Sequence, residues 1–182
     1  MFEGAQKSVD MPFLDQSDLL WEELASIAQD ESLVLYDAER VSAGLLRVAI
    51  DRPRAATIDS ASDEVAELGG VTSGDCTRLC RRLMVFFAAE GPRFGLLAEP
   101  EIEVSSPGVN RELRLPDHFA GALGKRIKVI ARTNSEGVKP VVIGTLSRVG
   151  NDQIEMVDED NESLVALRFA DIKRANAEYK FR

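Results

Sequence analysis

The sequence has few of the residues that most often build metal sites and disulfides, and it has no long apolar run. It contains one histidine, His118, and two cysteines, Cys76 and Cys80. Their Cys-x-x-x-Cys spacing is not that of a redox or zinc motif, and two cysteines make no disulfide framework. No apolar run approaches the roughly 18 residues of a membrane span. We therefore expect no cofactor, no metal and no membrane partner, and we expect both cysteines to lie in a helix core.

The first residues also lack the features of a signal peptide. Residues 1–7 contain neither a basic region nor an apolar stretch, which predicts a cytoplasmic location. Apolar residues make up 45% and charged residues 29% of the 182-residue chain, as in globular proteins of one domain or two small ones.

Charge is distributed unevenly along the chain. The net charge of -9 argues against a general DNA-binding protein. Residues 1–115 hold 11 Lys and Arg against 21 Asp and Glu, whereas residues 116–182 hold 11 against 10. Two interpretations stay open: two domains with different partners, or acidity that serves only solubility.

The first half of the chain predicts two helices and three strands. A helix is expected from Ser17, with Trp21 as a core anchor. Thr72 and Asp75 fit a capping box at the start of a second helix, whose apolar stripe runs to Phe87. The expected strands are 33–37, 44–51 and 101–105. Residues 1–12 are predicted to be a loose tail and 55–68 a flexible loop.

The second predicted helix carries three arginines opposite its apolar stripe. They are Arg78, Arg81 and Arg82. Either a solvated helix face or contact with RNA phosphate explains these arginines. Because both explanations stay open, the three arginines are weaker candidates for a binding site.

The second half is dominated by short alternating strands. They are expected at 126–131, 141–149, 153–157 and 164–169, with Gly144 as a bend or bulge and turns at 134–137, 150–152 and 158–161. A short helix is predicted at 117–124 and a helical turn at 170–177. The fold class is therefore α+β: a KH-like or ferredoxin-like α/β sandwich over 13–115, then a small SH3-like (Sm-like) β-barrel over 116–182.

With both halves in view, the chain resembles the bacterial ribosome maturation factor RimP family over about residues 14–175. The resemblance rests on Gly70-Val-Thr-x-x-Asp-Cys76, Glu103-Val-Ser-Ser-Pro-Gly-Val-x-Arg111, Phe119-x-x-x-x-Gly124-Lys-x-Ile-Lys-Val and Ile172-x-x-Ala175. Asn110-Arg111-Glu112 stands where the family usually has Asp-Arg-Pro. The resemblance implies a two-domain, non-enzymatic protein without a cofactor that binds the immature small ribosomal subunit and assists its late assembly.

The turn after the third strand is the main candidate for a contact with the ribosome. Hydroxyls, backbone N–H groups and an arginine meet there, and the candidates are Ser105, Ser106, Pro107, Gly108, Asn110 and Arg111. A second basic edge is expected at Lys125, Arg126 and Lys128. A turn that only the fold needs remains the alternative for 105–108. The expected partners are small-subunit rRNA, a small-subunit ribosomal protein, or both, bound by a monomer.

Two other function classes compete with an RNA-associated assembly factor. The first is an adaptor whose acidic first domain holds a basic ribosomal protein without touching rRNA. The second is a hydrolase that uses Ser105 or Ser106 with His118. No Gly-x-Ser-x-Gly elbow supports the hydrolase.

Overall fold

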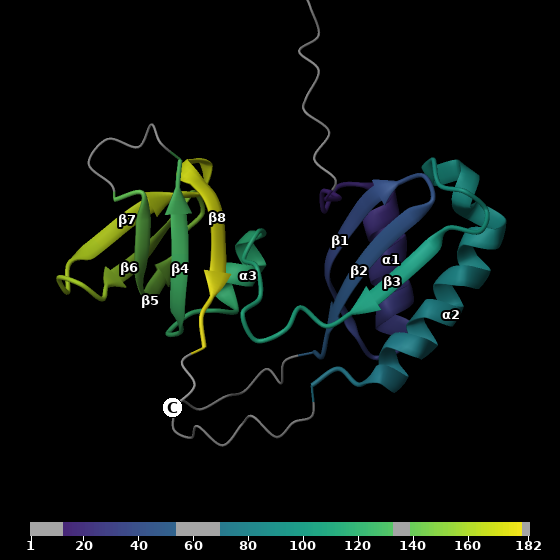
Figure 1. Cartoon of the computed structure of the whole chain (residues 1–182), viewed down its shortest axis with the longest axis horizontal. Helices are drawn as coiled ribbons and strands as arrows, with labels where there is room; N and C mark the ends of the chain where they lie inside the picture. The colour runs from purple at the N-terminus through teal and green to yellow at the C-terminus, as the bar shows by residue number, and fades with distance from the viewer. Residues whose placement is uncertain (1–12, 54–69, 133–138, 180–182) are drawn as a thin grey trace, which may run out of the picture. The chain divides into compact units, whose positions relative to one another are not determined.

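The fold is a mixed α+β arrangement with two separate sheets. The computed structural model describes residues 13–53, 70–132 and 139–179, and it divides the chain into two compact units, 1–106 and 107–182 (Figure 1). The sequence placed this division at 115/116. The unit boundary falls earlier because Leu113 is buried in the core of the second unit. The predicted tail 1–12, loop 55–68 and turn 134–137 lie outside the described residues.

The first unit places two helices against a three-stranded sheet. Its elements are α1 (Leu19–Asp30), β1 (Val34–Ser42), β2 (Leu45–Asp51), α2 (Ser73–Glu90), the 3-10 turn η2 (Gly91–Phe94) and β3 (Glu101–Ser105). The strand order is β1-β2-β3; β1 and β2 are antiparallel, and β3 runs parallel to β2. A parallel pair needs a crossover connection, which α2 supplies. β3 is therefore an edge strand of this sheet.

Helices and sheet of the first unit share one apolar core. Leu20 and Leu24 of α1, Leu79 and Leu83 of α2, and Ile50 of β2 are buried there. The predicted burial of Trp21 and the capping box of Thr72 and Asp75 are both confirmed. The helical spacing from Cys76 to Phe87 also predicts Met84 to lie on the apolar stripe, but this residue is 57% exposed.

The second unit contains a five-stranded antiparallel sheet. Its elements are α3 (Pro116–Ala120), β4 (Arg126–Ala131), β5 (Val141–Val149), β6 (Gln153–Asp158), β7 (Leu164–Arg168), the 3-10 turn η3 (Phe169–Asp171) and β8 (Ile172–Ala177). The order is β7-β6-β5-β4-β8, and the sheet is not closed into a barrel within the described residues. The core gathers Phe119 with inward residues of the strands, including Ile127, Leu146 and Ile154.

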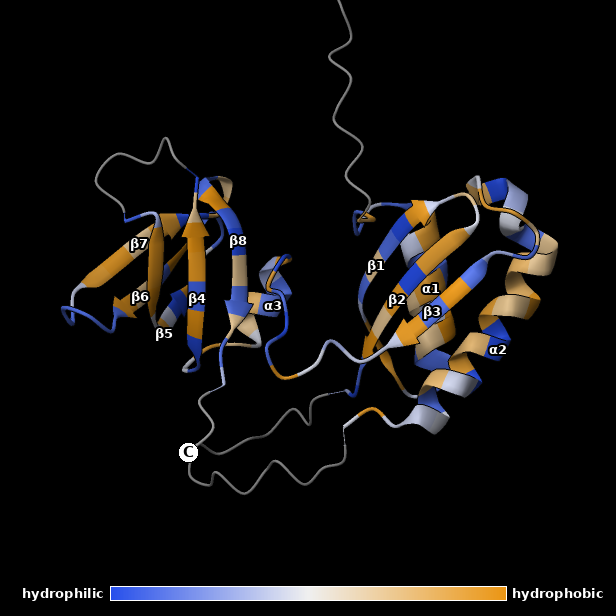
Figure 2. Ribbon diagram, in the orientation of Figure 1, coloured by the Kyte–Doolittle hydropathy of each residue, from blue (hydrophilic) through white to orange (hydrophobic). Residues whose placement is uncertain are grey.

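Two local predictions for the second unit were wrong. Residues 172–177 form β8, paired with β4, rather than a helical turn. Figure 2 shows β8 as a mixture of hydrophilic and apolar residues beside the more apolar β4. Ala175 and Ala177 are the buried residues of β8, and Ile172 packs against the same core while only partly buried. The irregularity in β5 falls between Leu146 and Arg148, not at Gly144, which pairs in regular register with Asp158.

No helix within the described ranges has both the length and the apolar character needed to cross a bilayer.

Candidate functional site

The predicted contact segment 105–111 is divided between the two units. Ser105 ends β3, and Ser106 follows it as the last residue of the first unit. Both serines are exposed, and neither side chain bonds to another described residue. Pro107 opens the second unit, and Gly108 is exposed with a φ of 73°. The hydroxyls are therefore available to a partner.

The second part of this segment is tied to β8. Backbone bonds run from Ala177 N–H to the Arg111 carbonyl (2.9 Å) and from Leu113 N–H to the Ala175 carbonyl (2.8 Å). The Asn110 side-chain oxygen accepts the N–H of Tyr179 at 3.0 Å. Arg111 Nε donates to the Gly108 carbonyl at 3.2 Å. Asn110 and Arg111, which the sequence predicts as contact residues, therefore both also stabilise the turn.

Gly108→Ala tests how far this turn depends on its left-handed residue. Nothing lies within 4 Å of an added Cβ at Gly108, so the cost is conformational. We expect a loss of about 1 kcal/mol in the free energy of unfolding of the second unit. Denaturant unfolding followed by far-UV circular dichroism measures it. Gly70→Ala, which also meets nothing within 4 Å and lacks a positive φ, is the control and should change stability less.

The basic edge at the start of β4 is partly neutralised. Arg126 Nε donates to Glu159 at 2.8 Å, and Arg126 also pairs with Glu178. The hydrogen bond to Glu159 is the main reason that the pKa of Arg126 is raised. Lys125 is exposed, and Lys128 lies opposite Asn176 of β8. Lys128 forms no ion pair with a residue in the described ranges, which makes it the clearest phosphate-binding candidate of the three.

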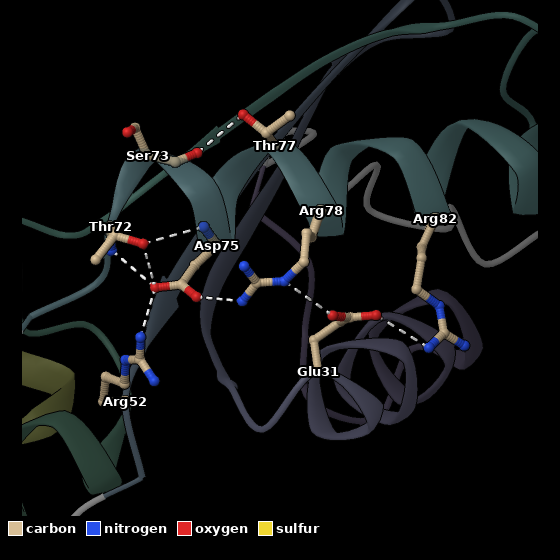
Figure 3. Close-up of polar contacts among 8 residues, drawn as sticks. All are labelled: Glu31, Arg52, Thr72, Ser73, Asp75, Thr77, Arg78 and Arg82. Carbon is tan, nitrogen blue, oxygen red and sulfur yellow. Dashed lines mark hydrogen bonds and ion pairs between the residues drawn. The ribbon is translucent and has the colours of Figure 1, made fainter.

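The arginines of α2 do not form one free basic face. Arg78 and Arg82 reach the carboxylate of Glu31 at 3.4 and 3.1 Å (Figure 3). Arg82 also reaches Asp30 at 2.9 Å. Glu31 caps the C-terminal end of α1, where cations are favoured. These pairs therefore join α1 to α2. Arg81 pairs with no carboxylate of the described residues.

A buried carboxylate at the start of α2 organises the neighbouring charges (Figure 3). Asp75 is 2% exposed and accepts the N–H and the hydroxyl of Thr72 at 2.9 and 2.7 Å. Arg52 donates to it at 2.7 Å, and Arg78 contacts its other oxygen. The pKa of Asp75 lies well below its usual value, chiefly because the Thr72 backbone and hydroxyl donate to the ionised form. The Thr72–Asp75 spacing predicted the cap, but nothing in the sequence pairs Arg52 with Asp75.

The histidine of the hydrolase alternative has another role in the structure. His118 is buried, and its Nδ1 accepts the N–H groups of Arg114 and Leu115 at 3.1 and 3.3 Å. Because Nδ1 holds the start of α3, His118 serves the local fold. The two serines belong to the other unit.

The two cysteines are free thiols and are only half-buried, which corrects the expectation of a full core position. Burial is the main reason that the pKa of the Cys76 thiol is raised, so this thiol is a weak nucleophile at neutral pH. The described residues contain no group of three or more His, Cys, Asp or Glu side chains placed to hold a metal ion.

A search of protein-family models found no match for this chain.

Proposed function

We propose that this protein is a ribosome maturation factor of the RimP type, which binds the immature small ribosomal subunit and assists its late assembly. In this proposal the first unit is the KH-like or ferredoxin-like module, and the open five-stranded sheet corresponds to the Sm-like module. The α–β–β–α–β order of the first unit supports this. The observation that carries the proposal is the exposure of the Ser105 and Ser106 hydroxyls, which no described residue engages.

The proposed contact with rRNA is a backbone contact. Serine hydroxyls, backbone N–H groups and lysines bind phosphate and sugar without reading sequence. Ser105 and Ser106 supply hydroxyls from the first unit, and Lys128 supplies a charge from the second. The logarithm of the binding constant falls as the logarithm of the salt concentration rises, and each phosphate that a cation neutralises makes this slope more negative by about 0.7–0.9.

A second candidate function is the adaptor that holds a basic ribosomal protein. Its support is the charge of the two units: residues 1–106 carry 9 Lys and Arg against 20 Asp and Glu, a net -11, and residues 107–182 carry 13 against 11, a net +2. Charge complementarity favours basic partners for the first unit and accelerates their association.

Binding of the purified protein to precursor and mature small subunits across a salt series tests the proposal. We expect a preference for the precursor with a steep salt slope. Lys128→Ala should make that slope less steep by about 1. The double variant Ser105→Ala/Ser106→Ala should weaken binding about fivefold. Ser26→Ala, at an exposed position of α1, is the matched control.

Three outcomes are informative. Absence of the protein from precursor fractions of a sucrose gradient at low salt would contradict the proposal. Tight binding to an isolated basic ribosomal protein, together with weak binding to rRNA fragments, would favour the adaptor. Equal affinity of the wild type and the serine double variant would exclude the two hydroxyls as contacts.

A further inference from the structure

The outer edge of β3 carries backbone groups that no second strand of the described residues pairs with. Among the residues that the structure describes, β3 pairs only with β2. The N–H of Glu101 donates to the carbonyl of Gly44, just before β2, at 2.8 Å. Successive residues of a strand direct their backbone groups to opposite sides, so those of Ile102 and Val104 point away from β2. This edge can accept another strand.

A groove runs between this edge and α2. It has a volume of about 270 Å³ and is lined by Cys76, Thr77, Cys80, Arg81, Ile102 and Val104. Ile102 and Val104 are only half-buried. The Cys80 thiol donates a weak hydrogen bond to the Ile102 carbonyl at 3.7 Å, so the outward groups that remain for a partner are the Ile102 N–H and the N–H and carbonyl of Val104. The floor of the groove is thus apolar. Arg81 also lines the groove, and its positive charge disfavours a basic side chain inside it.

The opposite face of the same edge is acidic. Glu101 and Glu103 alternate with Ile102 and Val104, and both glutamates are exposed. Glu103 pairs with Arg47 at 2.6 Å, and Arg47 also reaches Glu39 at 3.4 Å. Two carboxylates, those of Glu39 and Glu103, therefore share one guanidinium, and Glu101 lies on the same face of β3 as Glu103. A strand added to β3 would present every second side chain to these carboxylates.

We propose that β3 binds an extended segment of a basic protein by strand addition. Apolar side chains of the segment enter the groove, and the alternate side chains are Lys or Arg that face Glu101 and Glu103. Addition to a free sheet edge combines backbone hydrogen bonds with pockets for alternate side chains. This inference deepens the adaptor form of the proposed function and rests on it for the identity of the partner as a basic ribosomal protein.

A second copy of this chain fits the same edge poorly. Pairing of two β3 edges would bring Glu101 and Glu103 of both copies together on one face of the joined sheet, and like charges on paired strands repel. The charge of the edge therefore selects a basic partner.

Peptide binding to the full chain tests the proposal. The probe is a fluorescein-labelled peptide of four Lys-Val repeats, measured by fluorescence anisotropy. We expect it to bind at least about tenfold more tightly than Lys-Ser repeats, Glu-Val repeats, or Lys-Val repeats N-methylated on alternate residues. Hydrogen exchange supplies a local readout: the amides of Ile102 and Val104 should exchange quickly in the free protein and become protected by the peptide.

Variants separate the contributions of charge and backbone. Glu101→Lys should weaken Lys-Val binding about two- to fivefold, whereas Glu22→Lys, the same change at an exposed position of α1, should not. Val104→Pro removes an edge N–H and should weaken binding further, since proline is tolerated at sheet edges.

Equal binding of the methylated and unmethylated peptides would overturn the inference. So would a dimer that forms through β3 and excludes the peptide. Failure to bind the peptide by a protein that still binds precursor subunits would overturn this inference and leave the proposed function intact. A protein that binds the peptide but not the precursor subunits would support this inference and contradict the proposed function.

Discussion

Gly144→Ala is expected to destabilise the second unit by about 3 kcal/mol or more. Gly144 lies on the buried side of β5, opposite Asp158 of β6. An added Cβ would overlap the carbonyl oxygen of Val157 and lie 2.8 Å from its carbonyl carbon and 3.1 Å from the Asp158 Cα. All three atoms belong to the backbone, so no side chain can rotate to make room. The two strands would have to separate.

Two probes report on the two units separately. Trp21 is the only tryptophan, and it is buried in the first unit. In Gly144→Ala, the thermal transition seen by far-UV circular dichroism should acquire a component shifted down by more than 10 °C, since roughly 4–8 °C follow from each kcal/mol in a unit of this size. The Trp21 fluorescence transition should stay in place. Equal shifts in both probes would show that the units unfold together.

Gly150→Ala is the matched control for this experiment. Gly150 lies in the turn between β5 and β6, where an added Cβ would meet the Gln153 carbonyl oxygen at 3.3 Å. A displacement of a few tenths of an ångström relieves this contact, so we expect a loss below about 1 kcal/mol. A loss as large as that of Gly144→Ala would contradict the account based on close strand approach.

Asp75→Ala is expected to have the largest effect on the first unit. It removes the capping box of α2 and leaves Arg52 and Arg78 beside each other without the carboxylate that both contact. Loss of a buried, multiply hydrogen-bonded carboxylate should lower the melting temperature reported by Trp21 by roughly 10 °C. Asp30→Ala removes a carboxylate that is 57% exposed and pairs with Arg82. This control should change the melting temperature by only a degree or two, because exposed pairs contribute little.

The Asp75 carboxylate also predicts an acid dependence of stability. Its pKa is lower in the folded protein than in the unfolded protein, in which an aspartate has a pKa of about 3.9. The stabilisation is therefore fully present above the unfolded pKa and is lost as pH falls toward the folded pKa. Between neutral pH and pH about 3, the difference in melting temperature between wild type and Asp75→Ala should narrow. A constant difference over this range would contradict the assignment.

Most elements of the fold could be predicted from periodicity and capping. The capping pattern of Thr72 and Asp75 predicted the start of α2, and the alternation around Ile127 and Ile154 predicted β4 and β6. The strand β8 was missed because the alternation along Ile-Lys-Arg-Ala-Asn-Ala is weak: its fully buried residues, Ala175 and Ala177, are small, and Ile172 is only partly buried. The barrel closure predicted for the second sheet is not found among the described residues. Pairing of the two edge strands depends on strand bending, which alternation does not encode.

The candidate site was less predictable than the fold. Its residue types were found, but their partners lie far away in the sequence. Arg126 meets Glu178 across 52 positions, and Arg82 meets Glu31 across 51. A helical projection correctly placed Arg78, Arg81 and Arg82 away from the stripe, yet it could not show that α1 brings a carboxylate to two of them. Charge that looks free in a sequence is free only where the tertiary fold leaves it so.

The parallel pairing of β3 has a consequence for synthesis of the chain. β2 leaves the ribosomal exit tunnel well before β3, because α2 and the segment before it separate Asp51 from Glu101. During that interval one edge of β2, which includes buried Leu46, Val48 and Ile50, has no strand beside it, and such edges promote association between nascent chains. The first unit cannot complete its sheet until Ser105 has emerged. A translational pause that holds β3 inside the tunnel after β2 has emerged should therefore increase aggregation, whereas a pause after Ser105 has emerged should not.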